Sequence, residues 1–172
     1  AGVGWPVRPP HARSAGQDVT FDTYPYEWAS TRLLIQLPQW VQAGGPGPLK
    51  ERLADGAIRA RLREEMTRHN PVHGAPLSWA DVRLGAFTSA ANRQWEGRTL
   101  AEVSLETDRH PIDAICDLLL DEDLRLNQVT PGPNKAGTLR FLQHPVAMVG
   151  TDGVLIGDKP APRSYGSFPR IL

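Results

Sequence analysis

The stretch HPVAMVGTDG, residues 144–153, decides the predicted fold of this chain. Residues 146–150 (VAMVG) are apolar or small, which is typical of a fully buried strand of a parallel sheet. Asp152 follows this strand, and the carboxyl ends of parallel strands are where α/β folds place functional groups. We therefore expect Asp152 to act as a general base or to lie beside a metal. The alternative is that Asp152 and Gly153 only form a turn.

A second strand is predicted around residues 19–24 (VTFDTY), where β-formers gather and Pro25 ends the run. From Ser30 onward the pattern becomes helical, and the spacing predicts further helices over residues 49–67 and 111–120. Thr99 and Glu102 have the spacing of a capping box. Weak strands are predicted at residues 79–87 and 124–129. This alternation indicates an α/β architecture with parallel strands, and two strong strands this far apart leave the sheet incomplete.

The charged side of the helix over residues 49–67 is predicted to face solvent. Its arginines and glutamates lie opposite the apolar positions of the helical repeat: Arg59, Arg61, Arg63, Glu64 and Glu65.

The composition excludes several classes of protein. The 172 residues carry 19 Lys+Arg and 19 Asp+Glu, so no net charge draws the chain to nucleic acid or to an anionic membrane. One cysteine rules out an intrachain disulfide framework. No apolar run approaches the roughly 20 residues of a membrane span, and no signal peptide is visible. These features lead us to expect a soluble, cytoplasmic protein.

Two further groups of residues are candidates for binding a substrate. Tyr24 and Ser30, with Asp22 and Tyr26, follow the first strand, where hydroxyls could orient a carbonyl or carboxylate; alternatively the tyrosine rings fill the core. Arg163 and Lys159 lie in GDKPAPRSYGSFPRIL (157–172), where an arginine beside a strand-end carboxylate could hold an anion. The simpler interpretation of this second group is a pair of solvated loop charges.

The other reactive side chains give little signal. His69 and His73 are four residues apart, but Asn70 and Pro71 interrupt any helix that would align them on a metal. Cys116 lies on the apolar stripe of a predicted helix, as a buried structural thiol does.

Several motifs together resemble one family. They are VTFDTYPYEWAST (19–31), NRQWEGRTLAEV (92–103), PIDAICDLLLDEDL (111–124), HPVAMVGTDG (144–153) and GDKPAPRSYGSFPRIL (157–172). In this order they resemble the D-aminoacylases, or N-acyl-D-amino-acid deacylases, of the amidohydrolase superfamily. The resemblance runs from about Ala15 to the last residue, and residues 1–14 are expected to be a poorly ordered or non-native start.

The resemblance implies a fold and an activity. The family has a metal-dependent TIM barrel and hydrolyses N-acyl-D-amino acids to a carboxylate and a free D-amino acid. By this resemblance, residues 15–172 are an incomplete TIM barrel holding roughly its last two strands, and residues 33–125 are a helical insertion between them. Zinc is the expected cofactor of the complete enzyme, with its ligands outside this chain. The segment alone is expected to be inactive.

The resemblance also implies roles for four residues. Asp152 is the acid that takes a proton from the attacking water and passes it to the leaving amine. Tyr24 and Arg163 match positions that hold the substrate carboxylate, and Ser30 matches a position lining the same pocket.

Two other functions stay open from the sequence. One is a cyclic-amide hydrolase of the same superfamily, of the hydantoinase or dihydroorotase kind. The other is a non-catalytic binding module that keeps the pocket without the chemistry. The predicted partner of the chain is a small molecule, and its oligomeric state cannot be predicted from these residues.

Overall fold

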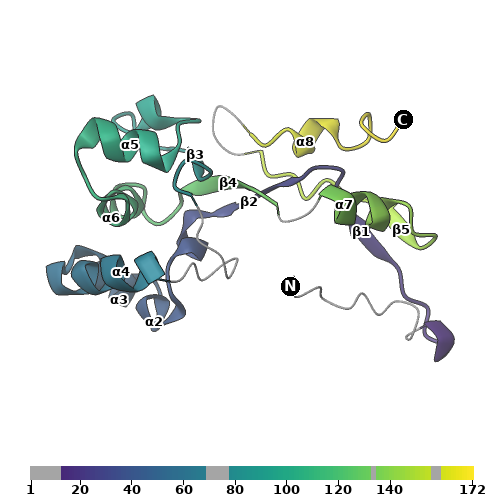
Figure 1. The fold of residues 1–172 in the computed structure, drawn as a ribbon, viewed down its shortest axis with the longest axis horizontal. Helices are drawn as coiled ribbons and strands as arrows, with labels where there is room; N and C mark the ends of the chain where they lie inside the picture. Colours follow the sequence, from purple (N-terminus) through teal and green to yellow (C-terminus); the bar gives the residue numbers. More distant parts are fainter. Residues whose placement is uncertain (1–12, 69–77, 133–134, 156–159) are drawn as a thin grey trace. The chain divides into compact units, whose positions relative to one another are not determined.

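The computed structural model describes residues 13–68, 78–132, 135–155 and 160–172. The backbone divides into two compact units whose elements are labelled in Figure 1. Unit 1 comprises Ala1–Glu27, Pro133–Gly153 and Pro162–Leu172, and unit 2 comprises Trp28–Gly132 and Val154–Ala161. The predicted irregular start at residues 1–14 falls almost entirely outside the described residues.

Unit 1 is built around two parallel strands from opposite ends of the chain. Strand β1 (Phe21–Thr23) pairs with β5 (Ala147–Val149), so that Phe21 lies opposite Ala147 and Thr23 opposite Val149. Helix α7 (Lys135–Leu142) leads into β5 and packs against both strands. The two strongest strands expected from the sequence are therefore present, paired and parallel.

The second strand of this pair is less buried than its sequence predicts. Residues 147 and 149 are only half-buried and the side chain of Met148 is 53% exposed, so the expectation of a fully buried strand is wrong. The reason is that β5 has a single neighbouring strand among the described residues. Phe21 covers part of the pair, since its ring meets Phe141 of α7 edge-on with centroids 5.7 Å apart.

Unit 2 contains a three-stranded antiparallel sheet. Its order is β2 (Trp28–Arg32), β4 (Asn127–Pro131) and β3 (Arg83–Gly85). Both pairings are antiparallel, so the predicted parallel arrangement applies to unit 1 and not to the weaker strands of unit 2. Ser30, expected to begin a helix, lies in β2 opposite Val129. This pairing joins residues about a hundred positions apart, which helical periodicity cannot reveal.

Helices cover the rest of unit 2, and local signals set their ends. Pro38 precedes α2 and Gly45 precedes α3. Asp55 separates α3 from α4 beside Gly56, so the helix predicted over residues 49–67 is divided in two. The elements are η1 (Leu33–Gln36), α2 (Gln39–Gln42), α3 (Pro46–Ala54), α4 (Gly56–Arg68), η2 (Arg93–Trp95), α5 (Leu100–Thr107) and α6 (Pro111–Asp121).

Both predicted signals at the helix starts near residues 99 and 111 are confirmed. Thr99 caps α5 by accepting a hydrogen bond from the Glu102 N–H, and the Glu102 carboxylate accepts one from the Thr99 N–H, which completes the capping box. The hydrogen bond from the Thr99 backbone also holds the pKa of Glu102 below its usual value. Pro111 is the first residue of α6, where an N–H has no partner within the helix, so the missing N–H of proline loses no helical hydrogen bond.

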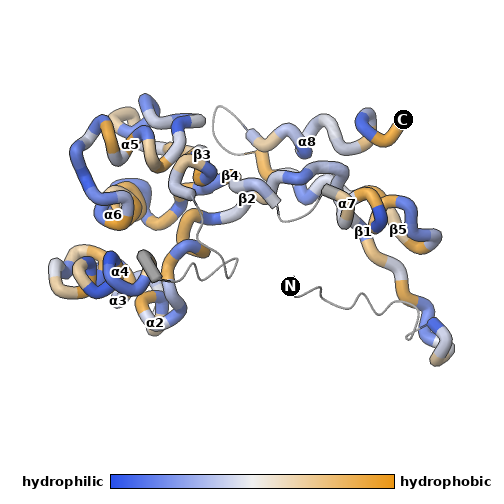
Figure 2. Tube along the Cα trace, in the orientation of Figure 1, coloured by the Kyte–Doolittle hydropathy of each residue, from blue (hydrophilic) through white to orange (hydrophobic). Residues whose placement is uncertain are grey.

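The hydrophobic core lies in unit 2 and is centred on α6. Four of its buried residues belong to one apolar cluster: Ile112, Ile115, Cys116 and Leu119. The other members of this cluster come from η1, α2, α3, α4, α5 and the residues around β3. Burial raises the pKa of the Cys116 thiol to about 11, so this thiol is inert, as predicted for a structural cysteine. Figure 2 shows hydrophobic residues interrupted by hydrophilic ones along the helices, and among the described residues none of the helices has the length and apolarity needed to cross a bilayer.

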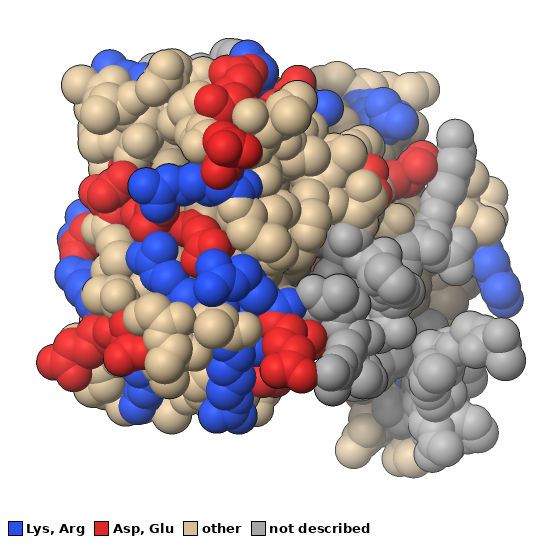
Figure 3. All heavy atoms as spheres, turned by 60° about the vertical axis from the view of Figure 1, so that its left-hand side comes forward, with Lys and Arg blue, Asp and Glu red and all other residues tan. Residues whose placement is uncertain are grey.

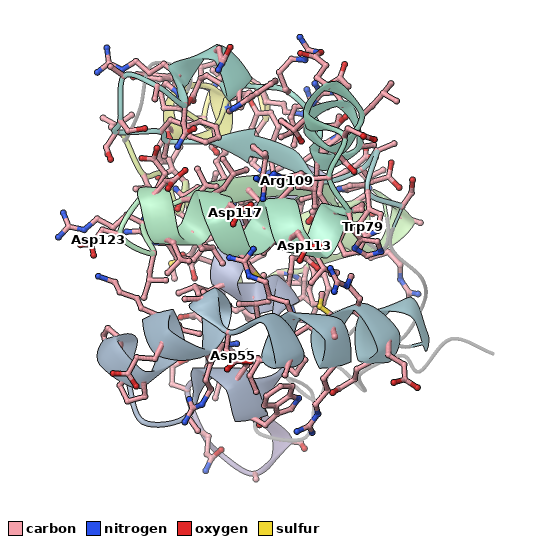
Figure 4. The ribbon with its side chains drawn as sticks, turned by 90° about the vertical axis from the view of Figure 1, so that its left-hand side faces the viewer. Asp55, Trp79, Arg109, Asp113, Asp117 and Asp123 are labelled. Carbon is pink, nitrogen blue, oxygen red and sulfur yellow. The ribbon has the colours of Figure 1, made fainter. Side chains whose placement is uncertain are left out.

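The charged side of α4 is not simply a solvated face. Arg59 lies 2.8 Å from Asp117 and Arg63 forms an ion pair with Asp113, so both reach α6. Figure 4 shows the two aspartates on the side of α6 that faces α4, and Figure 3 shows acidic and basic side chains alternating over this part of the surface. The expectation that this face is solvated is wrong for Arg59, whose side chain is 16% exposed beside Asp117, whereas the Arg63 side chain stays 40% exposed beside Asp113.

Candidate functional site

Asp152 is positioned by the end of β5. The Gly150 N–H donates to the carbonyl of Thr23, which continues the parallel ladder one residue past the strand. Asp152 then adopts φ +42°, in the left-handed region that aspartate tolerates better than most residues. Gly153 turns the chain away, and its N–H donates to Thr151 Oγ1 over 3.2 Å. This turn leaves the Asp152 side chain 68% exposed at the carboxyl end of the strand.

Arg163 holds Asp152 from the buried side. Nε of Arg163 donates to the main-chain oxygen of Asp152 over 2.9 Å, and Nη2 donates to Oδ2 over 2.8 Å. The Arg163 side chain is 4% exposed, at the start of the short helix α8 (Arg163–Gly166). A buried cation therefore contacts an exposed aspartate at one main-chain oxygen and at one carboxylate oxygen.

Tyr24 joins the same cluster from β1. It follows the last residue of β1, and the guanidinium carbon of Arg163 lies 4.6 Å from the centroid of its ring. A cation at this distance is attracted by the negative face of the ring. The structure thus brings Tyr24, Arg163 and Asp152 together at the carboxyl end of the β1–β5 pair, and Tyr24 and Asp152 each follow one of the two strands predicted from the sequence.

The fourth predicted residue, Ser30, belongs to the other unit. It lies in β2 of unit 2, opposite Val129, whereas the other three lie in unit 1. Its assignment to a substrate pocket stays a prediction. Lys159, the other cation proposed from the sequence, is outside the described residues.

Sequence reasoning missed the packing that surrounds this cluster. Arg170 lies over the ring of Tyr26 at 5.0 Å, which repeats the contact of Arg163 with Tyr24. A Cβ atom on Gly166 would collide with the Tyr26 hydroxyl, so only glycine allows this approach. The signal that could have revealed it is the pairing of two tyrosines in YPY with two arginines in PRSYGSFPR.

Gly153 is a second position that requires glycine. A Cβ atom there would lie 2.8 Å from the Cα of Ser164, closer than van der Waals contact permits. The turn after Asp152 therefore packs directly on the backbone of α8. Buried Ser167 adds to this packing by donating from Oγ to the main-chain oxygen of Arg163 over 2.8 Å.

Glu122 forms a separate buried polar cluster in unit 2 that the sequence does not predict. Its carboxylate is 1% exposed and accepts five hydrogen bonds, from the main chains and hydroxyls of Thr88 and Ser89 and from the Asn92 amide. Burial opposes ionisation, but the hydrogen bonds outweigh it and lower the pKa of Glu122 to about 2. This arrangement fixes the loop around residues 88–92 against the end of α6.

Within the described residues, the remaining metal-ligating side chains do not assemble into a metal centre. His110 Nδ1 accepts a hydrogen bond from the Ile112 N–H at the start of α6, and His144 Nδ1 accepts one from the Val146 N–H. His69 and His73 lie outside the described residues. Across residues 13–68, 78–132, 135–155 and 160–172, no three His, Cys, Asp or Glu side chains group as metal ligands, so this part of the chain does not fit a zinc centre by itself.

Comparison with known proteins connects this fold to one group of enzymes. The sequence matches no protein-family model and no curated protein. The structure is similar to N-acyl-D-glutamate deacylase from Bordetella bronchiseptica in complex with zinc and a phosphonate that mimics the tetrahedral intermediate. That match has a TM-score of 0.58 and 20% identity and covers 92% of this chain and 24% of the other.

Two D-aminoacylase structures are also similar. One, described as defining a novel subset of amidohydrolases, has a TM-score of 0.54 and 21% identity. The other, from work on a binuclear metal centre, has a TM-score of 0.55 and 22% identity. Both matches cover 94% of this chain and 24% of the enzyme, so the chain spans about a quarter of these proteins. The predicted resemblance to D-aminoacylases is confirmed as a likeness of fold, which is mixed α/β with small sheets.

Proposed function

We propose that this chain is part of an amidohydrolase that cleaves N-acyl-D-amino acids into a carboxylate and a free D-amino acid. The observation that carries the proposal is the contact of Tyr24, Arg163 and Asp152 at the carboxyl end of a parallel strand pair. It occurs in a chain whose fold resembles that of a deacylase and of D-aminoacylases.

Asp152 is the group proposed to move the protons. Amide hydrolysis takes a proton from the attacking water and delivers one to the leaving nitrogen, and a single carboxylate can do both in turn. The Asp152 side chain suits this task because it is exposed and because its contact with Arg163 uses Oδ2 only, so Oδ1 has no hydrogen-bond partner among the described residues.

Tyr24 and Arg163 are proposed to bind the substrate carboxylate, and Ser30 is proposed to line the same pocket. A guanidinium provides a planar fork of N–H donors that matches a carboxylate, and a tyrosine hydroxyl adds a neutral donor. A free carboxylate next to the scissile amide is what distinguishes N-acyl-amino acids from simple amides. An arginine beside the proton-transferring group would place the amide next to Asp152.

The similar enzymes include a zinc complex and a protein with a binuclear metal centre, and we extend metal dependence to the longer protein as part of the proposal. Because the described residues do not form a zinc centre, we assign no step through a metal to this chain.

We further propose that β1 and β5 are two strands of an incomplete TIM barrel, that residues 33–125 are an insertion between them, and that the protein is cytoplasmic.

The test is enzymatic and uses the longest protein that carries this chain. N-acetyl-D-amino acids, their L enantiomers and cyclic amides such as hydantoins are supplied separately, and amine release or ring opening is measured. We expect hydrolysis of the D substrates alone, and Asp152→Asn should lower kcat by at least about 100-fold with metal content unchanged. Hydrolysis of the cyclic amides but not of the D substrates would refute the proposal.

The 172-residue chain alone is proposed to be inactive. Its zinc content, measured by elemental analysis after purification, should be well below one ion per chain, and it should release no D-amino acid. Zinc-dependent turnover by this chain would show that its own residues complete the site.

A further inference from the structure

Arg163 is arranged to act on Asp152 as well as on a substrate. Two of its three nitrogens donate to this one residue, Nε to the main-chain oxygen and Nη2 to Oδ2. An arginine that served only as a substrate anchor would need neither bond. The main-chain bond in particular does nothing for a substrate, but it fixes the peptide that follows Asp152.

The two hydrogen bonds from Arg163 maintain the backbone conformation of Asp152. A φ of +42° lies in the left-handed region, which is less stable than the ordinary regions for a residue other than glycine, so something must maintain it. Relaxation of this angle would swing the carboxylate away from the end of β5. The two bonds from Arg163 join the backbone and the side chain of Asp152 to the same planar group, which opposes that rotation.

Arg163 is itself held in place on three sides. Its guanidinium lies over the Tyr24 ring, its main-chain oxygen accepts a hydrogen bond from Ser167 Oγ, and the next residue packs against Gly153. With a side chain that is 4% exposed, it forms a fixed support that can orient the exposed carboxylate of Asp152.

We propose that Arg163 is a positioning residue for Asp152. It fixes the left-handed turn and engages Oδ2, so that Oδ1 is presented as the proton-transferring atom. This inference rests on the proposed function for its catalytic meaning, while the structural role of Arg163 stands independently of it. Lysine cannot replace arginine here, because one ammonium group cannot reproduce the two fixed N–H directions.

The experiment compares Arg163→Lys and Arg163→Gln with Arg170→Gln, all in the longest protein that carries this chain. Arg170 is a matched control because it belongs to the same C-terminal segment and lies over a tyrosine, yet it has no hydrogen bond to Asp152. Kinetics with an N-acetyl-D-amino acid give kcat and KM separately, and hydrogen exchange with mass spectrometry follows the peptide covering residues 150–153.

Both Arg163 variants should lower kcat by about 100-fold and speed exchange in residues 150–153 by about tenfold or more, while Arg170→Gln changes neither by more than about threefold. A rise in KM with unchanged kcat and unchanged exchange would make Arg163 a substrate anchor only and overturn the inference. If the wild-type protein has no deacylase activity, the proposed function fails and the exchange measurement alone decides the inference. If Arg163→Gln does not fold, Arg163→Lys decides it.

Discussion

At the scale of single residues, two carboxylates illustrate how environment separates a solvent-exposed group from a structural one. Asp152 is 68% exposed and has one cationic partner, whereas Glu122 is 1% exposed and accepts five hydrogen bonds from neutral donors. The lowered pKa of Glu122, about 2, keeps it ionised and committed to its donors. Of the two carboxylates, only that of Asp152 is open to solvent.

Replacement of Glu122 by glutamine should destabilise unit 2. The glutamine amide brings N–H donors to a place where Thr88, Ser89 and Asn92 already donate, so at least one buried bond is lost. We expect the free energy of unfolding to fall by roughly 1–3 kcal/mol, measured by urea denaturation at pH 7. Glu51→Gln on α3 is the control, because Glu51 is exposed and should change stability by less than about 0.5 kcal/mol. Equal stability of the two variants would contradict the structural role of Glu122.

The lowered pKa of Glu122 predicts how the stability of the chain depends on pH. Its pKa is about 2 in the folded chain and about 4.3 when unfolded, so the unfolded state binds the proton first on acidification. The stabilisation, of the order of 3 kcal/mol, is therefore fully present above about pH 4.3 and is lost as the pH falls toward about 2. Urea midpoints of the wild type and of Glu122→Gln should converge between pH 4.3 and 2.5. A constant gap over this range would show that Glu122 titrates normally.

At the scale of elements, local signals were predictable, whereas the antiparallel pairing of β2 with β4 was not. The capping box at Thr99, the proline at the start of α6 and the break near Gly56 each depend on neighbours within four residues, and all are present. Strand β2 escaped prediction because its partner, β4, lies about a hundred residues further along the chain.

The candidate site likewise combines features that could be predicted from the sequence with one that could not. The end of a parallel strand could be predicted for both Tyr24 and Asp152, because the apolar runs before them are local features. The two-point contact of Arg163 with Asp152 could not, because it depends on the left-handed turn at Asp152 and on the approach of Gly153 to α8. A side-chain contact of this kind leaves no periodic pattern in the sequence from which it could be predicted.

The capping box of α5 offers a test at this scale. Thr99→Ala removes the hydroxyl that accepts the Glu102 N–H, and the loss of such a cap typically reduces stability by about 1 kcal/mol. Thr107→Ala, at the other end of α5, is the control, because its hydroxyl bonds back to the Val103 carbonyl, which the helix already satisfies. We expect thermal unfolding to start several degrees lower in Thr99→Ala than in Thr107→Ala. The reverse order would mean that the cap contributes nothing.

At the scale of the whole molecule, the two units differ in the interactions that stabilise each of them internally. All of the buried hydrophobic side chains of the described residues lie between Leu33 and Leu126, within unit 2. Unit 1 relies on two three-residue strands, a few ring contacts and the buried Arg163. A two-stranded sheet with exposed apolar side chains such as Met148 is marginally stable in water.

The difference predicts separate stabilities for the two units. Native-state hydrogen exchange of this chain should show the slowest amides in α6, because its helix is surrounded by the core, and amides of β1 and β5 exchanging at least about 100-fold faster. Low concentrations of urea should speed exchange in β1 and β5 while leaving α6 unchanged. Met148→Ala serves as the control for unit 1, since removal of an exposed side chain should leave exchange in α6 unaltered. Protection of β1 and β5 equal to that of α6 would mean that unit 1 is stabilised to the same degree as the core of unit 2, and would contradict the division of stability argued from burial.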